Sequence, residues 1–369
     1  MNKAYKFRIH PNADQRVMFA KTFGCVRFIY NKMLGDKIAH YNETQQDLGC
    51  YPSQYKVEFP FLKEVDSLAL VGAQNNLKAA YKNFFNNKSV GFPKFKSKRN
   101  SRKSYTTNCI NGNIKLLYGY IVLPKIGGVR IKQHRQIPVH YTLKSVTVSQ
   151  SPSGKYYASI LFEYEEIIEP TRMKFENEIR NTVGLDFSMA ELYVDSNGNE
   201  PKYNRYYRRS LDKLKKMSRA LSKMKKFSSN WYKQKYKIAI LHEKIANQRK
   251  DFLHKESRKI ANSYDLAGVE DLNMKAMSQA LNFGKSVADN SWGMFRTFLK
   301  YKLEEQGKYF VVIDKWFPSS KLCNVCEYKN DALDLSVRAW VCPDCGASHN
   351  RDVNAAINIR NEAVRMMTA

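Results

Sequence analysis

The sequence predicts a multi-domain α+β protein, in which a small β-barrel with inserted helices is followed by a domain with two acid-bearing strands. Three observations favour this fold class. Short runs rich in β-branched and aromatic residues crowd residues 114–164, long amphipathic patterns precede them, and two later apolar runs each end in a carboxylate. With 369 residues, of which 43% are hydrophobic, the chain can build two or three cores.

The first 91 residues combine one strand with a helical region. Tyr5, Phe7 and Ile9 alternate with basic residues, which is the period of a strand. Apolar residues then recur at helical spacing from Phe19 to about Tyr41, and again from about Val65 to Phe85. We therefore expect a long amphipathic helix and a second helix directly after the first strand.

The barrel is predicted from five short β-rich runs that glycine, proline and asparagine separate. They are Ile114–Leu117, Tyr120–Leu123, Val129–Lys132, Ser145–Gln150 and Tyr156–Tyr164. The strand near Tyr5 should join them. The barrel would then comprise residues 1–10 and 92–168, and the helices of residues 11–91 would be an insertion into it.

The charge of the chain points to a polyanionic partner. It holds 62 Lys+Arg against 34 Asp+Glu, a formal net charge of +28 that exceeds what solubility requires. One concentration of this charge follows Gly91, where basic residues alternate with Phe95 and precede Tyr105. This basic loop predicts contacts with a phosphate backbone, and a solvated loop is the alternative. Its candidate residues are Lys94, Lys96, Lys98, Arg99, Arg102 and Lys103.

A second concentration lies in residues 202–259, which hold 20 Lys+Arg and only 4 Asp+Glu. Apolar residues at helical spacing mark two helices here, so residues 203–260 should form a helical hairpin with an apolar seam and basic outer faces. A salt-bridged surface hairpin is the alternative, but it would need more acids. We expect nucleic-acid contacts from Lys215, Lys216, Lys225 and Lys226.

The second domain is organised around the apolar run Thr182–Met189, which reads as a buried strand that carries Asp186. A further apolar run at Leu192–Val194 precedes Asp195-Ser-Asn-Gly198, whose residues favour a tight turn. Asp186 is therefore expected on the first strand of a β-meander. A buried carboxylate is costly unless it is hydrogen-bonded, paired or bound to a metal.

Two further acids repeat the pattern. Glu270 ends the run Tyr264–Glu270, and Asp352 falls in the first turn of a helix that Asn350 can cap. The order strand-acid, strand-acid, helix-acid, with about 80 residues between successive acids, resembles the RNase H-like nucleases. Those enzymes hold two metal ions on three carboxylates to hydrolyse phosphodiesters. The catalytic candidates are thus Asp186, Glu270 and Asp352.

Other acids fall in positions that do not suit this role. We exclude Asp195, Asp265, Asp271 and Asp344 from the metal site, because they lie in a turn, before a strand, after one and inside a cysteine pair.

Four of the seven cysteines form two C-x2-C pairs separated by 15 residues: Cys323 with Cys326, and Cys342 with Cys345. This spacing predicts one zinc ion held by four thiolates, and a site filled by protein ligands is structural. His349 is then a surface or packing residue. Cys25, Cys50 and Cys109 are scattered and should behave as small apolar side chains.

Several of these motifs together carry a resemblance to a known family. They are Gly184-Leu-Asp186-Phe-Ser-Met, Gly268-Val-Glu270-Asp-Leu-Asn-Met274, Trp316-Phe-Pro-Ser-Ser-Lys-Leu-Cys323 and Cys342-Pro-Asp-Cys345 followed by Arg351-Asp-Val-Asn-Ala-Ala356. Arg27-Phe-Ile-Tyr-Asn31 and Ala80-Tyr-Lys-Asn-Phe-Phe85 extend the match to the N-terminal half. The chain resembles TnpB proteins, the transposon-encoded RNA-guided DNA endonucleases related to type V CRISPR effectors.

The resemblance implies a domain assignment. The barrel would be a wedge domain and the inserted helices a recognition domain. Residues 178–318 and 348–369 would form a RuvC-like, RNase H-like nuclease domain, and residues 319–347 an inserted zinc ribbon. The triad Asp186, Glu270 and Asp352 would hold two catalytic Mg²⁺ ions, besides one structural Zn²⁺. The family often has Asp where this chain has Asn350, so Asp352 is taken as the ligand.

The resemblance also implies partners. These are a guide RNA from the transposon end, with its guide segment at the 3′ end, and double-stranded target DNA with a short adjacent motif. The N-terminal helices would read that motif, with Tyr51, Ser67, Leu68 and Val71 as candidates. No segment resembles a helix-turn-helix that could read a long site, so base pairing should supply specificity.

We expect a prokaryotic cytoplasmic, nucleoid-associated protein. No apolar run is long enough for a membrane span, and no apolar segment follows the N-terminus. Two rival functions stay open: a nuclease-inactive RNA-guided DNA-binding repressor and an autonomous transposase. The presence of all three acids argues against the first, and joining of DNA ends would identify the second. The sequence leaves the oligomeric state open.

Overall fold

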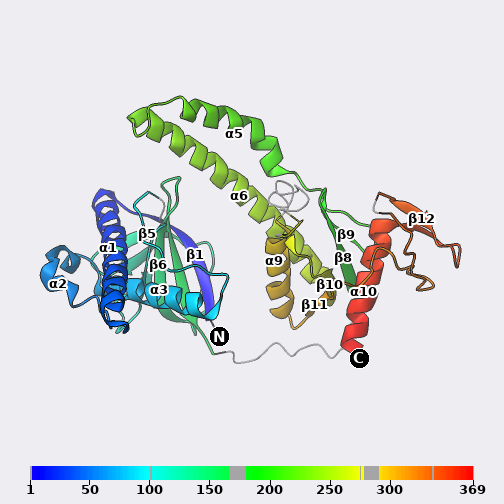
Figure 1. Cartoon of the computed structure of the whole chain (residues 1–369), viewed down its shortest axis with the longest axis horizontal. Helices are drawn as coiled ribbons and strands as arrows, with labels where there is room; N and C mark the ends of the chain where they lie inside the picture. Colours follow the sequence, from blue (N-terminus) through cyan, green and yellow to red (C-terminus); the bar gives the residue numbers. More distant parts are fainter. Residues whose placement is uncertain are drawn as a thin grey trace. The chain divides into compact units, whose positions relative to one another are not determined.

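A computed structural model of the chain describes residues 2–99, 102–165, 180–274, 276–277, 291–334 and 336–368. The chain forms two compact units, Met1–Ile167 and Ile168–Ala369 (Figure 1). Each unit has its own sheet and its own hydrophobic core.

The first unit is built on a seven-stranded sheet. Its strands are β1 (Asn2–His10), β2 (Lys103–Asn108), β3 (Lys115–Leu117), β4 (Tyr120–Leu123), β5 (Gly127–Lys132), β6 (Thr142–Gln150) and β7 (Tyr156–Glu163). They follow the order β2-β6-β7-β1-β5-β4-β3, and every neighbouring pair is antiparallel. The first strand thus joins the later ones, as expected. β2 and β3 lie at the two ends of this order, so the described strands make a curled sheet that hydrogen bonds do not close into the predicted barrel.

The helices of the first unit lie between β1 and β2 in the chain: α1 (Ala13–Thr44), α2 (Tyr55–Glu58), the 3-10 turn η1 (Pro60–Lys63) and α3 (Ser67–Asn86). A capping box formed by Asn12 and Gln15 starts α1, and Gln45 ends it in a left-handed conformation. α3 packs closely on β2, because a Cβ at Gly72 would lie 2.5 Å from the carbonyl oxygen of Thr106. The helices and the sheet therefore share one core.

Strand β2 differs from the sequence-based expectation, which ended the basic loop at Lys103 and recognised no strand after it. The segment is polar, with Tyr105 as its one large apolar side chain, so it lacks the hydrophobic alternation of a strand. Pairing with β6 and packing against α3 form it instead. The hydroxyl of Thr107 donates to Asp66, the residue that caps α3, and so ties the strand to the helix.

The second unit contains a mixed sheet of β8 (Thr182–Ser188), β9 (Leu192–Asp195), β10 (Leu266–Glu270) and β11 (Tyr309–Ile313) in the order β11-β10-β8-β9. β8, β10 and β11 are parallel, and β9 is antiparallel to β8. The helices α6 (Ser229–Ser263) and α9 (Trp292–Glu304) pack on one face through Leu253, Trp292 and Phe295. α10 (Arg351–Thr368) packs against β8 and β10 from the other face (Figure 1).

The expected meander is only partly present. β8 and β9 pair as predicted, and the turn after β9 has a left-handed Gly198. The carboxylate of Asp195 accepts from the backbone N–H groups of Asn197 and Asn199 and holds this turn. Within the described chain, however, no third antiparallel strand follows Gly198 in the sheet.

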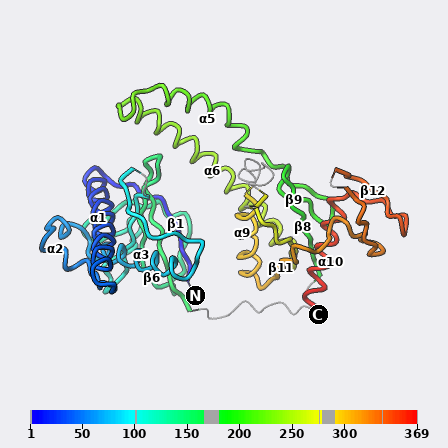
Figure 2. Tube along the Cα trace, in the orientation of Figure 1, coloured from blue at the N-terminus to red at the C-terminus, as the bar shows by residue number. Residues whose placement is uncertain are grey.

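A helical hairpin is formed by α5 (Tyr206–Ser222) and α6, as the sequence predicted. Phe227, in a left-handed conformation, lies in the turn, and the hydroxyl of Ser228 caps α6. Figure 2 shows the two helices running beside each other beyond the edge of the mixed sheet. The short strands β12 (Ala339–Val341) and β13 (Ser348–Asn350) pair directly before α10.

Candidate active site

The two strand acids lie on the same face of the mixed sheet. Side chains alternate between faces, so Asp186 shares a face with Gly184 on β8, and Glu270 shares one with Gly268 on β10. The parallel register pairs Leu185 with Val269, which places Asp186 and Glu270 on neighbouring strands one residue further along. Adjacent strands lie about 4.8 Å apart, so the two carboxylates are neighbours.

The helix that carries the third acid covers this face at very short range. A Cβ at Gly184 would lie 1.9 Å from the carbonyl oxygen of Ala356, and one at Gly268 would lie 2.7 Å from the Cβ of Ala363. Only glycine lets α10 approach the strands so closely. Asn350 caps the helix, because its side-chain oxygen accepts from the N–H groups of Asp352 and Val353 at 3.0 and 3.2 Å. Asp352 therefore sits in the first turn, as expected.

Among the three acids, Asp186 is the one whose pKa reflects the charges of the other two. Burial raises the pKa of Asp186 well above its usual value, and the charges of Glu270 and Asp352 raise it further. Burial also raises the pKa of Glu270, although a hydrogen bond from Ser319 opposes this increase. The guanidinium of Arg338 donates to Asp352 at 3.2 Å. Buried acids with a raised pKa are typical of functional sites.

These carboxylates fit hard divalent cations by their donor chemistry, because Mg²⁺ prefers oxygen ligands. Burial and, after it, the charges of Glu270 and Asp352 raise the pKa of Asp186, and a bound divalent cation would favour its ionised form against both.

The four cysteines lie together, and their sulfur atoms all fall within 4.8 Å of one another. Cys323 and Cys345 are 3.7 Å apart at Sγ, and Cys326 and Cys342 are 3.6 Å apart. Tetrahedral zinc with sulfur ligands at about 2.3 Å would separate the sulfurs by about 3.8 Å. The cluster therefore fits one zinc ion held by four thiolates.

His349 is buried beside this cluster. Its ring lies 4.6 Å from that of Trp340, and its Nε2 is 3.1 Å from Sγ of Cys323. His349 packs beside the four cysteine sulfurs, which agrees with the packing role expected for it.

Three of the four acids that were set aside have structural partners in the described chain. Asp195 holds the turn after β9, Asp265 lies 3.6 Å from the ammonium of Lys308, and Asp271 lies 3.7 Å from the guanidinium of Arg296.

Some residues of the basic loop are exposed, and others contact side chains elsewhere in the first unit. Lys94, Lys98 and Arg102 are exposed. Lys96 places its ammonium 3.7 Å from the centre of the Tyr30 ring, and burial lowers its pKa. Lys103 lies on the edge strand β2 and donates to Gln150. A contact with phosphate would therefore require Lys96 to leave its aromatic partner. Sequence spacing does not reveal this pairing, because Tyr30 lies on α1.

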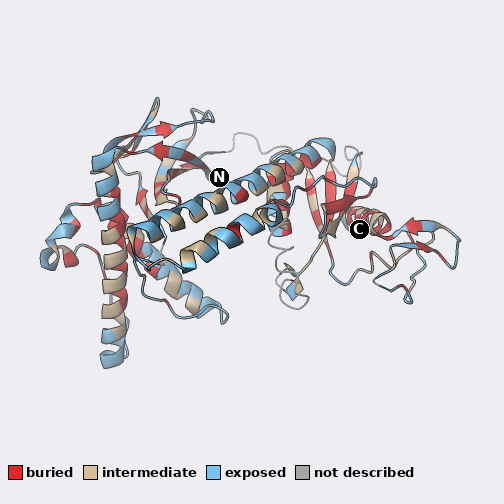
Figure 3. Ribbon diagram, turned by 90° about the horizontal axis from the view of Figure 1, so that it is seen from above, coloured by how far each residue is buried: buried red, intermediate tan, exposed pale blue. Residues whose placement is uncertain are grey.

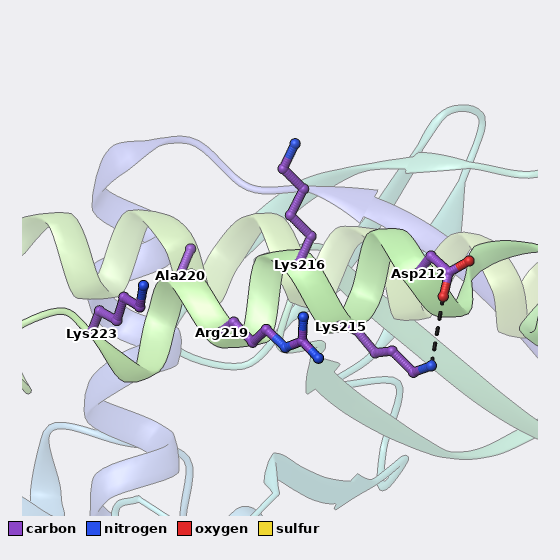
Figure 4. A pocket seen from close by; sticks show the side chains of 6 residues that line it. All are labelled: Asp212, Lys215, Lys216, Arg219, Ala220 and Lys223. Carbon is purple, nitrogen blue, oxygen red and sulfur yellow. Dashed lines mark ion pairs between the residues drawn. The ribbon is translucent and has the colours of Figure 1, made fainter.

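The hairpin presents a basic surface. A pocket on α5 is lined by Asp212, Lys215, Lys216, Arg219, Ala220 and Lys223 (Figure 4). Within it, Lys215 pairs with Asp212 at 3.6 Å. Lys225 and Lys226 are exposed in the turn, and Figure 3 shows how much of both helices is exposed.

The sequence-based interpretation missed an exposed stripe of two tyrosines and an isoleucine on the hairpin. Tyr232, Tyr236 and Ile240 recur every four residues along α6 and are 55, 48 and 42% exposed. Lys233 and Lys237 are exposed on the same helix. The four-residue spacing of these side chains could have revealed the stripe. It was overlooked because apolar residues at helical spacing were assigned to the seam between the two helices.

The four N-terminal candidates lie on two segments of the first unit. Tyr51 is 59% exposed before α2, while Ser67, Leu68 and Val71 are exposed or half-buried in the first turns of α3. The ammonium of Lys56 donates to the hydroxyl of Ser67.

None of the helices in the described ranges is long and apolar enough to cross a bilayer.

Three family models match the chain. One described as "Probable transposase" (OrfB_IS605) matches residues 159–281, and one described as "Cas12f1-like, TNB domain" matches residues 292–359. A third, described as "Helix-turn-helix domain" (HTH_OrfB_IS605), matches residues 1–46. The expectation that no segment resembles a helix-turn-helix is therefore wrong, because this family model matches the chain. In the structure, the matched segment contains the strand β1 and one helix, α1.

Similar proteins cover nearly the whole chain. "Putative RNA-guided DNA endonuclease" of Streptomyces pristinaespiralis is 34% identical over 369 residues, which span 97% of this chain and 89% of the relative. "Putative RNA-guided DNA endonuclease InsQ" of Escherichia coli K12 is 31% identical over 97% of this chain and 91% of its own length. Proteins of a mimivirus named "TnpB-like" match shorter stretches.

Among solved structures, the fold resembles the protein in a cryo-EM structure of a Cas12f1-sgRNA-target DNA complex. The TM-score is 0.62 at 12% identity, over 98% of this chain and 99% of that one. At this identity the likeness concerns the fold alone.

Proposed function

This chain belongs to the TnpB family, and we propose that it is a transposon-encoded, RNA-guided DNA endonuclease. The observation that supports the proposal is the pairing of β8 with β10, which puts Asp186 beside Glu270 on the face that α10, with Asp352 in its first turn, covers. The named relatives support the guided activity, and the acids supply a site that could perform it.

Asp186, Glu270 and Asp352 would hold divalent cations, with Mg²⁺ as the natural choice for oxygen ligands. Two such ions would polarise the scissile phosphate and neutralise charge on the attacking and leaving oxygens. The chain supplies the geometry. The sheet would hold Asp186 beside Glu270, and the close approach of α10 would bring Asp352 toward them.

The cysteine cluster would hold a structural zinc ion, because four thiolates leave no position for water or substrate. Its second pair precedes Asn350, the cap of α10, by only a few residues. We propose that zinc holds this segment so that the first turn of α10 presents Asp352 to the other acids.

The hairpin would bind nucleic acid along its basic surface. Lys215, Lys216, Lys225 and Lys226 would contact phosphates, and the stripe of Tyr232 and Tyr236 offers faces on which bases can stack. In the first unit, the exposed residues of the basic loop would add phosphate contacts.

The domain assignment is part of the proposal. Residues 1–10 and 92–168 would act as a wedge domain and residues 11–91 as a recognition domain that reads a short motif through Tyr51, Ser67, Leu68 and Val71. Residues 178–318 and 348–369 would be the nuclease domain, with the zinc ribbon at 319–347. The partners would be a guide RNA from the transposon end and target DNA.

The test is a product analysis with protein purified together with its RNA. A labelled DNA duplex that matches the RNA should be cut with Mg²⁺ present, and it should stay intact with EDTA or after RNA removal. Binding without cutting would favour the repressor, and joined DNA ends would favour the transposase. Either of these results would contradict the proposal.

A further inference from the structure

The loop that leads into the first cysteine pair lies between Glu270 and α10. Within it, the carbonyl of Pro318 accepts from the N–H groups of Lys321 and Leu322 at 2.9 and 3.0 Å, so the loop forms a tight turn. Cys323 follows directly. The loop thus connects the candidate zinc site with the candidate nuclease site.

Ser319 is fixed in this turn through each of its polar groups. Its N–H donates to the carbonyl of Phe317 at 2.9 Å, and its carbonyl accepts from the amide of Asn358 at 2.8 Å. Its hydroxyl donates to Oε1 of Glu270. The residue is only 5% exposed, so water does not compete freely for these bonds.

Two buried amides of α10 hold the turn from the other side. Asn358 also donates to the carbonyl of Leu322 at 2.7 Å, and Asn354 donates to the same carbonyl at 2.8 Å. The oxygen of Asn354 accepts from the N–H of Asn324, inside the first cysteine pair, at 3.1 Å. Asn354 and Asn358 are 1 and 3% exposed. A buried amide with these partners fixes the backbone it contacts.

We propose that Ser319 is a positioning residue for Glu270, and that Asn354 and Asn358 lock it in place against the helix that carries Asp352. The inference rests on the proposed function, because it assigns Glu270 to a cation site. Ser319 occupies one carboxylate oxygen and so fixes the rotamer that presents the other oxygen. Partners that orient a metal ligand in this way commonly contribute 10- to 100-fold to metal affinity or activity.

The arrangement also explains why the loop precedes a cysteine pair. Cys323 donates its N–H to the carbonyl of Tyr328 at 2.9 Å, and the cluster holds its sulfur. The position of Ser319 is therefore defined by the cysteine site on one side and by α10 on the other. Through Ser319, this loop links Glu270 to α10, the helix that carries Asp352.

The experiment compares Ser319→Ala, Ser319→Thr and Glu270→Gln in the full chain. Mn²⁺ binding to RNA-free protein is measured by titration, and the Mg²⁺ concentration for half-maximal cleavage is measured with RNA. Ser319→Ala should weaken Mn²⁺ binding about tenfold and raise the Mg²⁺ requirement similarly. Ser319→Thr keeps the hydroxyl and should restore both. Zinc content and target affinity should match wild type in all three.

Two results separate the failure of this inference from that of the proposed function. If Glu270→Gln weakens Mn²⁺ binding but Ser319→Ala binds like wild type, Ser319 has only a structural role. If Glu270→Gln also binds like wild type, the proposed cation site itself is wrong, and the inference falls with it.

The amides of α10 offer a matched pair of variants. Asn358→Ala should raise the Mg²⁺ requirement as Ser319→Ala does, because it releases the carbonyl of Ser319. Asn361 is exposed on the same helix, and its side-chain oxygen accepts from the neighbouring Arg360, so Asn361→Ala should behave like wild type. Equal behaviour of the two variants would overturn the locking role of Asn358.

Discussion

The acid site and the helical hairpin of the second unit differ in how their charged side chains are arranged. At the acid site, the pairing of β8 with β10 places Asp186 beside Glu270, and burial raises the pKa of both. Along the hairpin, like charges are spread over exposed helical faces, and the lysines of the turn reach into solvent.

This difference indicates that the acid site can determine cleavage and the hairpin can determine nucleic-acid binding. Charges gathered by a rigid backbone can hold cations and act on one bond, while charges spread along exposed helices can only attract a long polyanion. Changes at the first region should therefore remove cleavage and leave binding intact. Changes at the second should weaken binding and flatten its salt dependence.

The largest loss of cleavage is expected from Asp186→Ala. Cation catalysis supplies several kcal/mol, and each 1.36 kcal/mol is a factor of ten, so cleavage should fall at least about 1000-fold. Target binding should stay close to that of wild type, because this acid does not contact the nucleic-acid backbone in our account. Both quantities can be measured on one labelled duplex. Asp271→Ala, which removes an exposed acid paired with Arg296, serves as the control and should cut normally.

Cys342→Ser should have the next largest effect. Structural zinc contributes on the order of 10 kcal/mol to the folding of its module, and the module adjoins the cap of α10. Zinc measured by elemental analysis should fall below the one equivalent expected of wild type, and cleavage should fall with it. Cys109→Ser removes a thiol outside the cluster and should keep its zinc. Wild-type protein free of zinc would rule out the four-thiolate site.

The hairpin should respond in binding and in its salt dependence. Reversing the charge of Lys215, Lys216, Lys225 and Lys226 should weaken binding of RNA or of the RNA-DNA heteroduplex. The slope of log affinity against log salt should flatten by about 0.7 to 0.9 for each phosphate that the variant no longer neutralises. Arginine at the same four positions keeps the charge and should preserve the slope. A reversed hairpin with the wild-type slope would show that these lysines only face solvent.

The smallest effect concerns Lys302, a buried lysine where α9 packs on the base of the hairpin. Its ammonium donates to the carbonyl of His254 and the hydroxyl of Ser257, both at 2.6 Å, and burial lowers its pKa to about 8. Between about pH 8 and its usual 10.5, the unfolded chain keeps a proton that the folded chain has lost. Stability relative to Lys302→Met should therefore rise with pH across this window, by at most about 3 kcal/mol. Melting curves of both proteins at several pH values test this, and parallel curves would contradict it.

Local sequence patterns were sufficient for the elements that carry the acids. A short apolar run that ends in an acid predicted β8 and β10, and Asn350 predicted the start of α10. The cysteine spacing predicted a cluster that the structure contains. Each of these features depends on residues close together in the chain, which is why a sequence can show it.

Features that depend on distant residues could not be predicted in this way. Ser319 reaches Glu270 across 49 residues, and nothing in its own segment marks it as a partner of an acid. Lys96 was grouped with the basic loop, while its ammonium lies over Tyr30 on another element. The strand β2 is polar and exists because β6 and α3 supply its partners. In each case tertiary contacts outweigh the local pattern.

The most direct test of the account exchanges only the guide. A single DNA carries two target sequences beside the same adjacent motif, and the protein is prepared with RNAs that differ only in their guide segment. The account predicts that the cut moves from one target to the other with the guide, and that protein stripped of RNA shows no preferred site. A cut that stays in place, or one defined site cut without RNA, would contradict it.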